Sequence, residues 1–391
     1  MRCHARRHSI SRVEDAEEIE RLISELHSTP QPEAPVAGDV ARLERWLSLL
    51  AERGGSDLLL VAGAPPSIRV DGKMQPLAEG PLDGVDVEDA VLPGLAPHAR
   101  RLYRAAQIAD GSFRIAGVGR FRINLHRERG RAAAAIRMLP TRVPRLATLG
   151  LPDAVESLAH LPRGLVLIGG PTGSGKTTTL AALVEEINRR DARHILTIED
   201  PIEYEHLHQH SLIEQVEIGI DAPDFPTALR AALRQAPDVI VVGEMRDPET
   251  MRIALTAAET GHLVLSTVHT TDVASTVSRI ADSFPSERQN TIRQELAMAI
   301  AAVMTQSLLP KIGGGVIPAA ELLLIGYGAR QHIRRNALQH LHQEITITRR
   351  QGSITLEESL AALVKEGLVE WREAHARAAH VEEFETLAPP P

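Results

Sequence analysis

A glycine-rich segment between an apolar run and a helical stripe carries the clearest chemical pattern in this sequence. Residues 170–177 read GPTGSGKT, which matches the phosphate-binding pattern G-x-x-x-x-G-K-[ST] at every fixed position. Glycines let backbone N–H groups wrap a phosphate chain, the lysine reaches the β- and γ-phosphate oxygens, and the threonine hydroxyl suits Mg²⁺. The segment therefore predicts that ATP or a similar nucleotide binds here together with Mg²⁺.

The helix after this segment is predicted independently of the motif. Apolar side chains follow the loop at the i, i+3, i+4, i+7 spacing of one helix face, so the positive end of a helix would also face the phosphates. Within the loop, Lys176 is the expected phosphate contact and Thr177 the expected magnesium ligand. The residues expected to bind nucleotide are Gly170, Pro171, Thr172, Gly173, Ser174, Gly175, Lys176, Thr177 and Thr178.

Acidic residues follow two later apolar runs. Glu199, Asp200 and Glu203 come after the run at 195–198, and Glu244 comes after the run at 239–242. In an open α/β sheet the ligand meets the carboxyl ends of the strands. A carboxylate there can enter the Mg²⁺ shell or orient the attacking water, so these acids predict hydrolysis as well as binding.

Two histidines flank a further apolar run, and the residues alone leave their role open. His262 opens the run at 263–268 and His269 closes it. Lone histidines serve more often as core or loop groups than as catalysts.

The elements that position these residues can be predicted from hydrophobic patterning. Apolar runs at 165–168, 195–198, 239–242 and 263–268 alternate with helical segments. This alternation predicts an α/β fold with a parallel sheet covered on both faces.

The remaining segments give less specific expectations. A helix is expected at 13–27, ahead of a proline-rich tether, and another near 43–51. Phe121, Ile123 and Leu125 alternate with polar residues, which predicts a half-buried strand. After about residue 305 we expect mostly helix, with a glycine-rich turn at 313–315.

Composition narrows the class of protein. The net charge of −8 and the 3% aromatic content disfavour direct nucleic-acid binding, which relies on basic and stacking side chains. The single cysteine, Cys3, fits a reducing compartment. Because we find no signal peptide and no apolar stretch of membrane-spanning length, we expect a cytoplasmic location.

Four segments resemble, in the same order, four sequence motifs of the secretion ATPase superfamily: the Walker A, Asp, Walker B and His boxes. They are the phosphate loop, TIEDPIEY at 197–204, DVIVVGEMRD at 238–247 and TGHLVLSTVHTTD at 260–272. Segments outside this core, at 56–72, 117–130 and 354–378, are similar to the pilus retraction (PilT-type) ATPases. The resemblance covers roughly residues 40–385.

This resemblance implies a domain organisation. Residues 1–39 would be an N-terminal extension and linker, and residues 40–145 a smaller α+β PAS-like domain. Residues 146–325 would form a RecA-like P-loop ATPase domain with a parallel sheet. Residues 326–391 would form a helical C-terminal region and tail.

The resemblance also implies roles for individual residues. Glu203 would be the base that orients water, and Glu244 would join Thr177 in the magnesium shell, directly or through water. His269 would act near the γ-phosphate, with Lys176 completing the catalytic set, and His262 would contribute to the nucleotide site. Arg122 and Arg137 would reach the nucleotide when a subunit closes.

The function implied is an Mg-dependent ATPase that works as a homohexameric motor for type IV pilus retraction and twitching motility. Its partners would be an inner-membrane pilus platform protein and the pilus machinery, with peripheral association at the inner membrane. Residues 328–341 follow the retraction signature only loosely. The identity of the membrane partner, the direction and order of subunit firing and the role of residues 1–39 stay open.

Three other functions also stay open. The strongest rival is a type IVB secretion or conjugation ATPase. A hexameric nucleic-acid translocase and a nonhydrolysing ATP-binding regulatory subunit are the other two. A pilus-assembly or type II secretion motor is disfavoured because one cysteine cannot supply a tetracysteine zinc insert.

Overall fold

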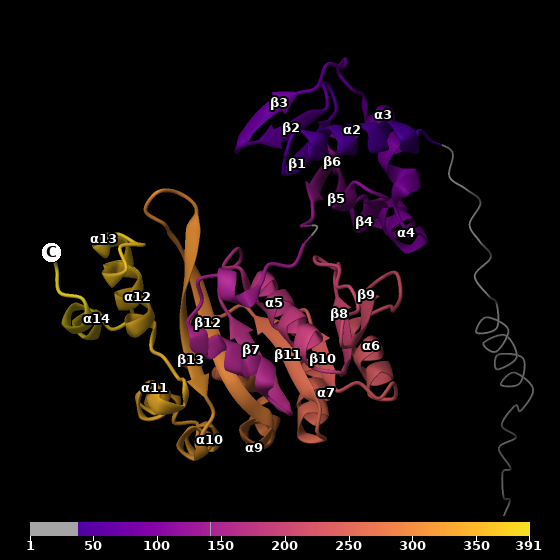
Figure 1. The fold of residues 1–391 in the computed structure, drawn as a ribbon. Coiled ribbons are helices and arrows are strands. Elements are labelled where there is room, and N and C mark those ends of the chain that lie inside the picture. The colour runs from indigo at the N-terminus through magenta and orange to yellow at the C-terminus, as the bar shows by residue number, and fades with distance from the viewer. Residues whose placement is uncertain (1–37, 141) are drawn as a thin grey trace, which may run out of the picture. The chain divides into compact units, whose positions relative to one another are not determined.

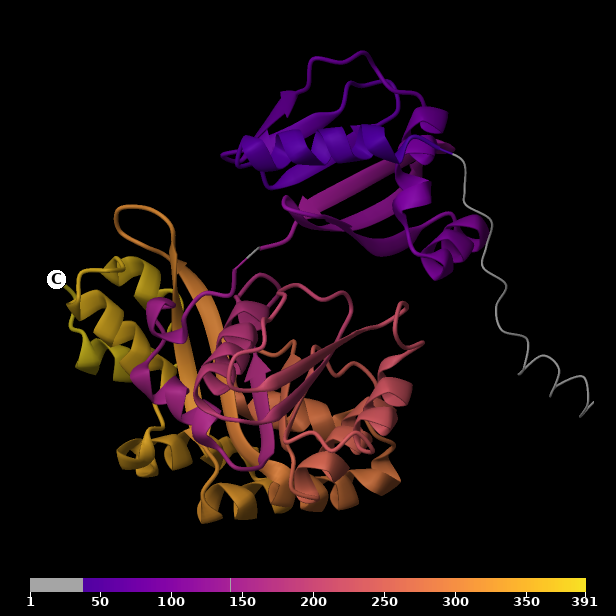
Figure 2. The same cartoon turned by 45° about the vertical axis from the view of Figure 1, so that its right-hand side comes forward.

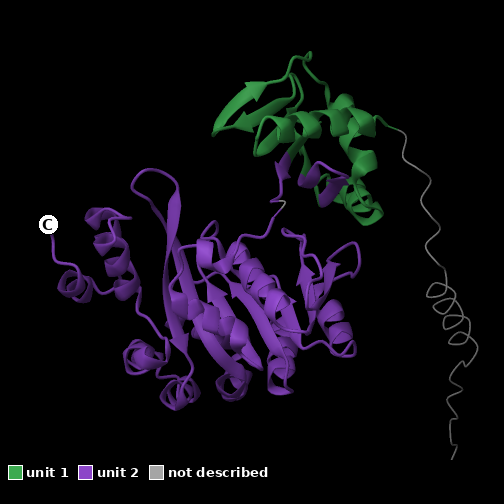
Figure 3. Cartoon of the chain, viewed as in Figure 1, with its two compact units in different colours: residues 1–110, 124–135 green, residues 111–123, 136–391 purple. Residues whose placement is uncertain are grey.

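The computed structural model describes residues 38–140 and 142–391, so the helix expected at 13–27 lies outside the described residues. The chain divides into two compact units (Figure 3). Among the described residues, the first contains 38–110 together with 124–135, and the second contains 111–123, 136–140 and 142–391.

A six-stranded sheet accompanies the N-terminal helices, with strand order β3-β2-β1-β6-β5-β4. The alternation predicted at 121–125 is confirmed, because Phe121, Ile123 and Leu125 are fully buried along β5. The elements are α2 (Val40–Glu52), β1 (Asp57–Val61), β2 (Ser67–Val70), β3 (Lys73–Pro76), α3 (Gly84–Val91), η1 (Leu92–Gly94), α4 (Pro97–Ala106), β4 (Ala109–Ile115), β5 (Gly119–Glu128) and β6 (Arg131–Met138).

A seven-stranded sheet forms the centre of the second unit, in the order β13-β12-β7-β11-β10-β8-β9 (Figure 1). All neighbouring strands are parallel except β12 and β13. The four predicted apolar runs are β7, β8, β10 and β11, which confirms the predicted parallel sheet. The strands are β7 (Gly164–Gly169), β8 (His194–Glu199), β9 (Leu212–Glu217), β10 (Val239–Val242), β11 (Leu263–Val268), β12 (Ile300–Pro310) and β13 (Val316–Leu324).

Helices cover both faces of this sheet (Figures 1 and 2). Side chains of β7 alternate between the two sides: Leu165 and Leu167 join one core cluster, and Val166 and Ile168 join the other. One face is covered by η2 (Leu146–Thr148), η3 (Asp153–His160) and α5 (Lys176–Arg190), and the other by α6 (Phe225–Ala232), α7 (Pro248–Glu259), α8 (Val273–Asp282), α9 (Ser286–Ala299), α10 (Tyr327–Arg334) and α11 (Leu341–Ile347).

The expectation of mostly helix after residue 305 was wrong for residues 305–324. They belong to the antiparallel hairpin of β12 and β13, whose turn holds the predicted glycines 313–315. A short apolar run reads the same for a buried strand as for a buried helix, and β12 is buried along most of its length.

The chain is helical beyond the hairpin, as expected. A third core cluster lies beneath the last helices and includes Leu309, Ile317, Leu360 and Phe384. The remaining elements are η4 (Leu338–His340), η5 (Arg349–Gln351), α12 (Leu356–Lys365), α13 (Trp371–His375) and α14 (Val381–Leu387).

Within residues 38–140 and 142–391, no helix combines the length and apolar character needed to cross a bilayer. The uninterrupted apolar residues 297–304 (AMAIAAVM) are divided between the end of α9 and the start of β12.

Candidate nucleotide-hydrolysis site

The phosphate loop joins the central strand β7 to helix α5, as the motif predicts. Gly175 occupies the cap position of α5 with φ +88°, a backbone conformation that suits glycine. At Gly170, whose φ is +151°, an added Cβ would lie 2.6 Å from the carbonyl oxygen of Gln306. These two glycines therefore allow the loop to turn tightly against the neighbouring strand.

Lys176 lies along the loop, with a side chain that is only 7% exposed. Its Nζ donates to the carbonyl oxygens of Gly170 at 2.8 Å and Pro171 at 3.0 Å. Burial lowers the pKa of Lys176, and the negative charge of Glu244 partly offsets this effect. The loop carbonyls thus hold the ammonium group where a phosphate chain would approach.

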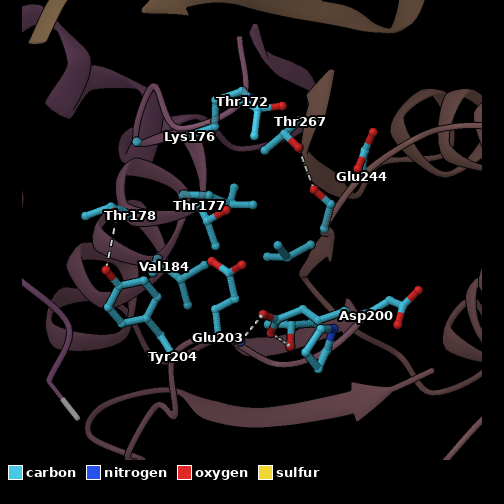
Figure 4. Close-up of a pocket in the computed structure, with 18 of the residues that line it drawn as sticks. Thr172, Lys176, Thr177, Thr178, Val184, Asp200, Glu203, Tyr204, Glu244 and Thr267 are labelled. Atoms are coloured by element: carbon cyan, nitrogen blue, oxygen red, sulfur yellow. Dashed lines mark hydrogen bonds between the residues drawn. The ribbon is translucent and has the colours of Figure 1, made fainter. Parts of the chain in front are cut away.

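One cavity brings the loop and the strand-end acids together. The Glu203 carboxylate is directed toward Thr177 (Figure 4). The acids and His269 come from the carboxyl ends of β8, β10 and β11, where ligands of open α/β sheets bind. Predicted residues that line the cavity are Thr172, Gly173, Gly175, Lys176, Thr177, Thr178, Glu199, Asp200, Glu203, Glu244 and His269. Gly170, Pro171 and Ser174 complete the loop outside this lining.

The Glu199 carboxylate contacts the backbone of the segment that carries Glu203. The Glu199 carboxylate accepts hydrogen bonds from the Thr197 hydroxyl at 2.7 Å, from Gln215 at 3.2 Å and from the backbone N–H of Glu203 at 3.4 Å. Burial raises the pKa of Glu199, and these donors partly offset the effect. Glu199 therefore orients the backbone of the segment, while the Glu203 side chain faces the loop.

Glu244 has a cationic or ring-nitrogen neighbour at each carboxylate oxygen. Its Oε1 lies 3.2 Å from His269 Nε2, and its Oε2 lies 2.8 Å from Arg246. Carboxylate and hydroxyl oxygens are the donors that Mg²⁺ prefers. Glu244 and Thr177 line the same cavity, so the donor set fits this ion.

The sequence interpretation missed two polar contacts of the cavity. The Tyr204 and Thr178 hydroxyls lie 3.0 Å apart, and Thr267 donates to the Gly243 carbonyl oxygen at 2.6 Å. Tyr204 directly follows Glu203, and Thr267 lies two residues before His269. Their proximity to predicted site residues was the only available signal.

The structure places Arg122 and Arg137 at the cavity and His262 away from it. Arg122 and Arg137 both belong to the second compact unit and both line the cavity. His262, in contrast, precedes β11 at the end of the strand opposite to His269, and its Nδ1 lies 2.9 Å from the Ala257 carbonyl oxygen. A strand of this length spans about 20 Å, and His262 is absent from the lining of this cavity. Its contribution to the nucleotide site stays a prediction.

Known proteins resemble this chain over most of its length. Residues 127–365 match the family model "Type II/IV secretion system protein". The type IV pilus retraction ATPase PilT of Pseudomonas aeruginosa is 41% identical over 338 residues, covering 86% of this chain and 98% of that protein.

Solved structures agree with the sequence matches. The crystal structure of the pilus retraction motor PilT with bound ADP is 41% identical, with a TM-score of 0.80, covering 90% of this chain and 100% of that one. The ATPase DotB of Legionella pneumophila is 27% identical, with a TM-score of 0.78 and coverage of 88% and 97%. The similarity in sequence is thus greater to the retraction motor than to DotB.

Proposed function

Because the chain belongs to the type II/IV secretion system protein family and is closely related to PilT-type retraction ATPases, we propose that it hydrolyses ATP to power type IV pilus retraction. One observation supports the proposal of hydrolysis: a complete phosphate loop shares a cavity with Glu203, whose carboxylate is directed toward Thr177. The relationship to PilT supports the retraction role.

The loop and helix α5 bind the triphosphate. Backbone N–H groups of the loop and the positive end of α5 contact the phosphate oxygens. Lys176 exchanges its contacts with the Gly170 and Pro171 carbonyls for the β- and γ-phosphate oxygens. This exchange places a positive charge where negative charge accumulates during phosphoryl transfer.

Glu203 orients the attacking water and accepts its proton. Thr177 and Glu244 would hold Mg²⁺, directly or through water. When bound, Mg²⁺ neutralises phosphate charge and favours in-line attack. His269 acts beside the γ-phosphate while its ring nitrogen fixes the Glu244 carboxylate.

Arg122 and Arg137 add positive charge to the same cavity. An arginine that reaches a transferring phosphoryl group raises the rate by about 10³ to 10⁵. In the proposed motor, six copies of the chain form a ring at the cytoplasmic face of the inner membrane. Hydrolysis in successive subunits drives movement of the inner-membrane pilus platform protein.

The biochemical test uses the purified full-length chain and its Lys176→Ala variant. We expect the wild type to release phosphate from ATP and to lose this activity on chelation of Mg²⁺. The variant loses tight nucleotide binding, because Lys176 supplies the charge between the β- and γ-phosphates. Equal ATP affinity in the two proteins would contradict the site assignment.

The cellular test follows fluorescent pili on single cells of the source bacterium after deletion of the gene. We expect pili to accumulate without shortening, and wild type but not Lys176→Ala to restore shortening. Normal pilus dynamics in the deletion strain, combined with ATPase activity in vitro, would instead favour a secretion function such as that of the type IVB ATPases.

A further inference from the structure

Gln306 is a buried amide on β12, the strand adjacent to β7, and its side chain is 4% exposed. Its Nε2 donates to the Ser174 carbonyl oxygen at 2.6 Å. Its Oε1 accepts a hydrogen bond from the Thr179 hydroxyl at 2.8 Å. One side chain thus joins the phosphate loop to the first turn of α5, although it lies 132 residues away from Ser174 in sequence.

The orientation of this amide follows from the chemistry of its neighbours. A backbone carbonyl oxygen can only accept, so the Ser174 carbonyl requires the NH₂ group of Gln306. The amide oxygen is then left for the hydroxyl of Thr179, which is 2% exposed. Both ends of the amide are satisfied, and a flipped amide would place two acceptors in contact.

The backbone of β12 approaches the loop at the same point. The Gln306 carbonyl oxygen lies 2.6 Å from a Cβ built on Gly170, and its Nε2 lies 3.1 Å from a Cβ built on Gly175. The loop therefore rests directly on Gln306 at both of its motif glycines.

We propose that Gln306 is a positioning residue for nucleotide binding, because it fixes the direction of the Ser174 carbonyl in the phosphate loop. A peptide whose carbonyl is held toward β12 cannot rotate to present that oxygen to the phosphates, so the loop N–H groups stay available for them. The inference rests on the proposed nucleotide-binding function and adds a residue outside the sequence motif.

The competing explanation is that Gln306 only stabilises the sheet. A purely structural role would lower the melting temperature and leave the affinity of folded protein for nucleotide unchanged. Asn188 is a suitable comparison, because it is a fully buried amide at the other end of α5 that donates to the Leu207 carbonyl oxygen at 2.8 Å and accepts from the Gln209 N–H at 3.1 Å.

The experiment titrates full-length wild type, Gln306→Met and Asn188→Leu with fluorescent N-methylanthraniloyl-ADP, and measures Tm, KM for ATP and kcat. We expect Gln306→Met to raise Kd and KM about tenfold, with a smaller change in kcat because loop contacts act in ground and transition states alike. We expect Asn188→Leu to lower Tm while Kd stays within about twofold.

A second pair of variants covers the case in which Gln306→Met does not fold. Thr179→Val removes the hydroxyl that orients the amide, and Thr179→Ser retains it. We expect the valine variant to weaken ADP binding severalfold and the serine variant to bind as wild type does. Folded Gln306→Met or Thr179→Val protein with wild-type Kd would overturn the inference.

Failure of this inference differs from failure of the proposed function. If wild type binds ADP and Lys176→Ala does not, while the Gln306 and Thr179 variants bind normally, only the role of Gln306 is rejected. If wild type itself binds no nucleotide, both proposals are rejected.

Discussion

His269 Nε2 lies 3.2 Å from Oε1 of Glu244, so the residue after β11 contacts the acid that follows β10. The other Glu244 oxygen is paired with Arg246, and loss of the histidine would leave the carboxylate held from one side only. We expect His269→Ala to lower kcat at least about tenfold with a smaller effect on ATP affinity. Steady-state kinetics and nucleotide titration separate the two effects.

His262 provides the matched control for that variant. It flanks the same strand at the opposite end, and we expect His262→Ala to change kcat by less than about twofold. A large loss of turnover in His262→Ala would mean that His262 contributes to hydrolysis although it does not line this cavity.

For Glu203→Gln, we expect nucleotide affinity to be retained while turnover falls by about 10² to 10⁴. The amide has nearly the same shape, but it cannot accept the proton from water. Glu205→Gln is the control, because that carboxylate is 42% exposed, pairs with Arg114 and lies two residues away. Near-normal turnover in Glu203→Gln would assign the base role to another acid.

Tyr204→Phe tests whether the contact between α5 and the segment that carries Glu203 is needed for activity. The substitution removes the hydroxyl that lies 3.0 Å from Thr178 and keeps the ring. A single hydrogen bond contributes about 1 kcal/mol, so we expect kcat/KM to fall roughly fivefold. An unchanged kcat/KM would show that the segment is positioned by its other contacts, such as those of Glu199.

Arg122→Ala and Arg137→Ala test the role proposed for the two cavity arginines. If they stabilise the transferring phosphoryl group, each variant should bind ATP and lose at least about tenfold in kcat. Arg129→Ala, at a side chain that is 83% exposed, is the control for loss of surface charge. Equal kcat values in all three variants would exclude the proposed role.

Glu321 makes stability depend on pH. Burial raises its pKa to about 7, and the negative charges of Asp272 and Glu357 add to the effect, whereas the Val273 N–H and His342 oppose it. The pKa of Glu321 in the folded protein exceeds the ordinary value of 4.5. Its contribution to the free energy of unfolding is therefore fully present below pH 4.5. The contribution is lost as pH rises through 7.

Glu321→Gln removes the ionisable group and keeps an oxygen that can accept from Val273 and Thr305. We expect it to stabilise the protein at pH 8 by up to about 3 kcal/mol, with little effect at pH 4.5. Melting temperatures at the two pH values measure this, with exposed Glu366→Gln as the control. An equal Tm difference at both values would contradict the titration of Glu321.

Short sequence patterns predicted those parts of the site whose residues are close together in the sequence. The motif at 170–177 and the runs before Glu203 and Glu244 each combine strand, turn and function within a few residues. Gln306 could not be found in this way, because its partners are distant in sequence and its strand resembles a buried helix in composition. His262 was assigned to the nucleotide site by resemblance alone, and its position before β11 places it at the amino edge of the sheet, opposite the carboxyl ends where the cavity lies.

The third core cluster, beneath α12 to α14, is separate from the two clusters that flank the central sheet. Separate clusters allow partial unfolding, because one can lose its packing while the others keep theirs. We therefore expect the last helices to exchange their amide hydrogens in a cooperative opening of lower free energy than global unfolding, while α5 stays protected.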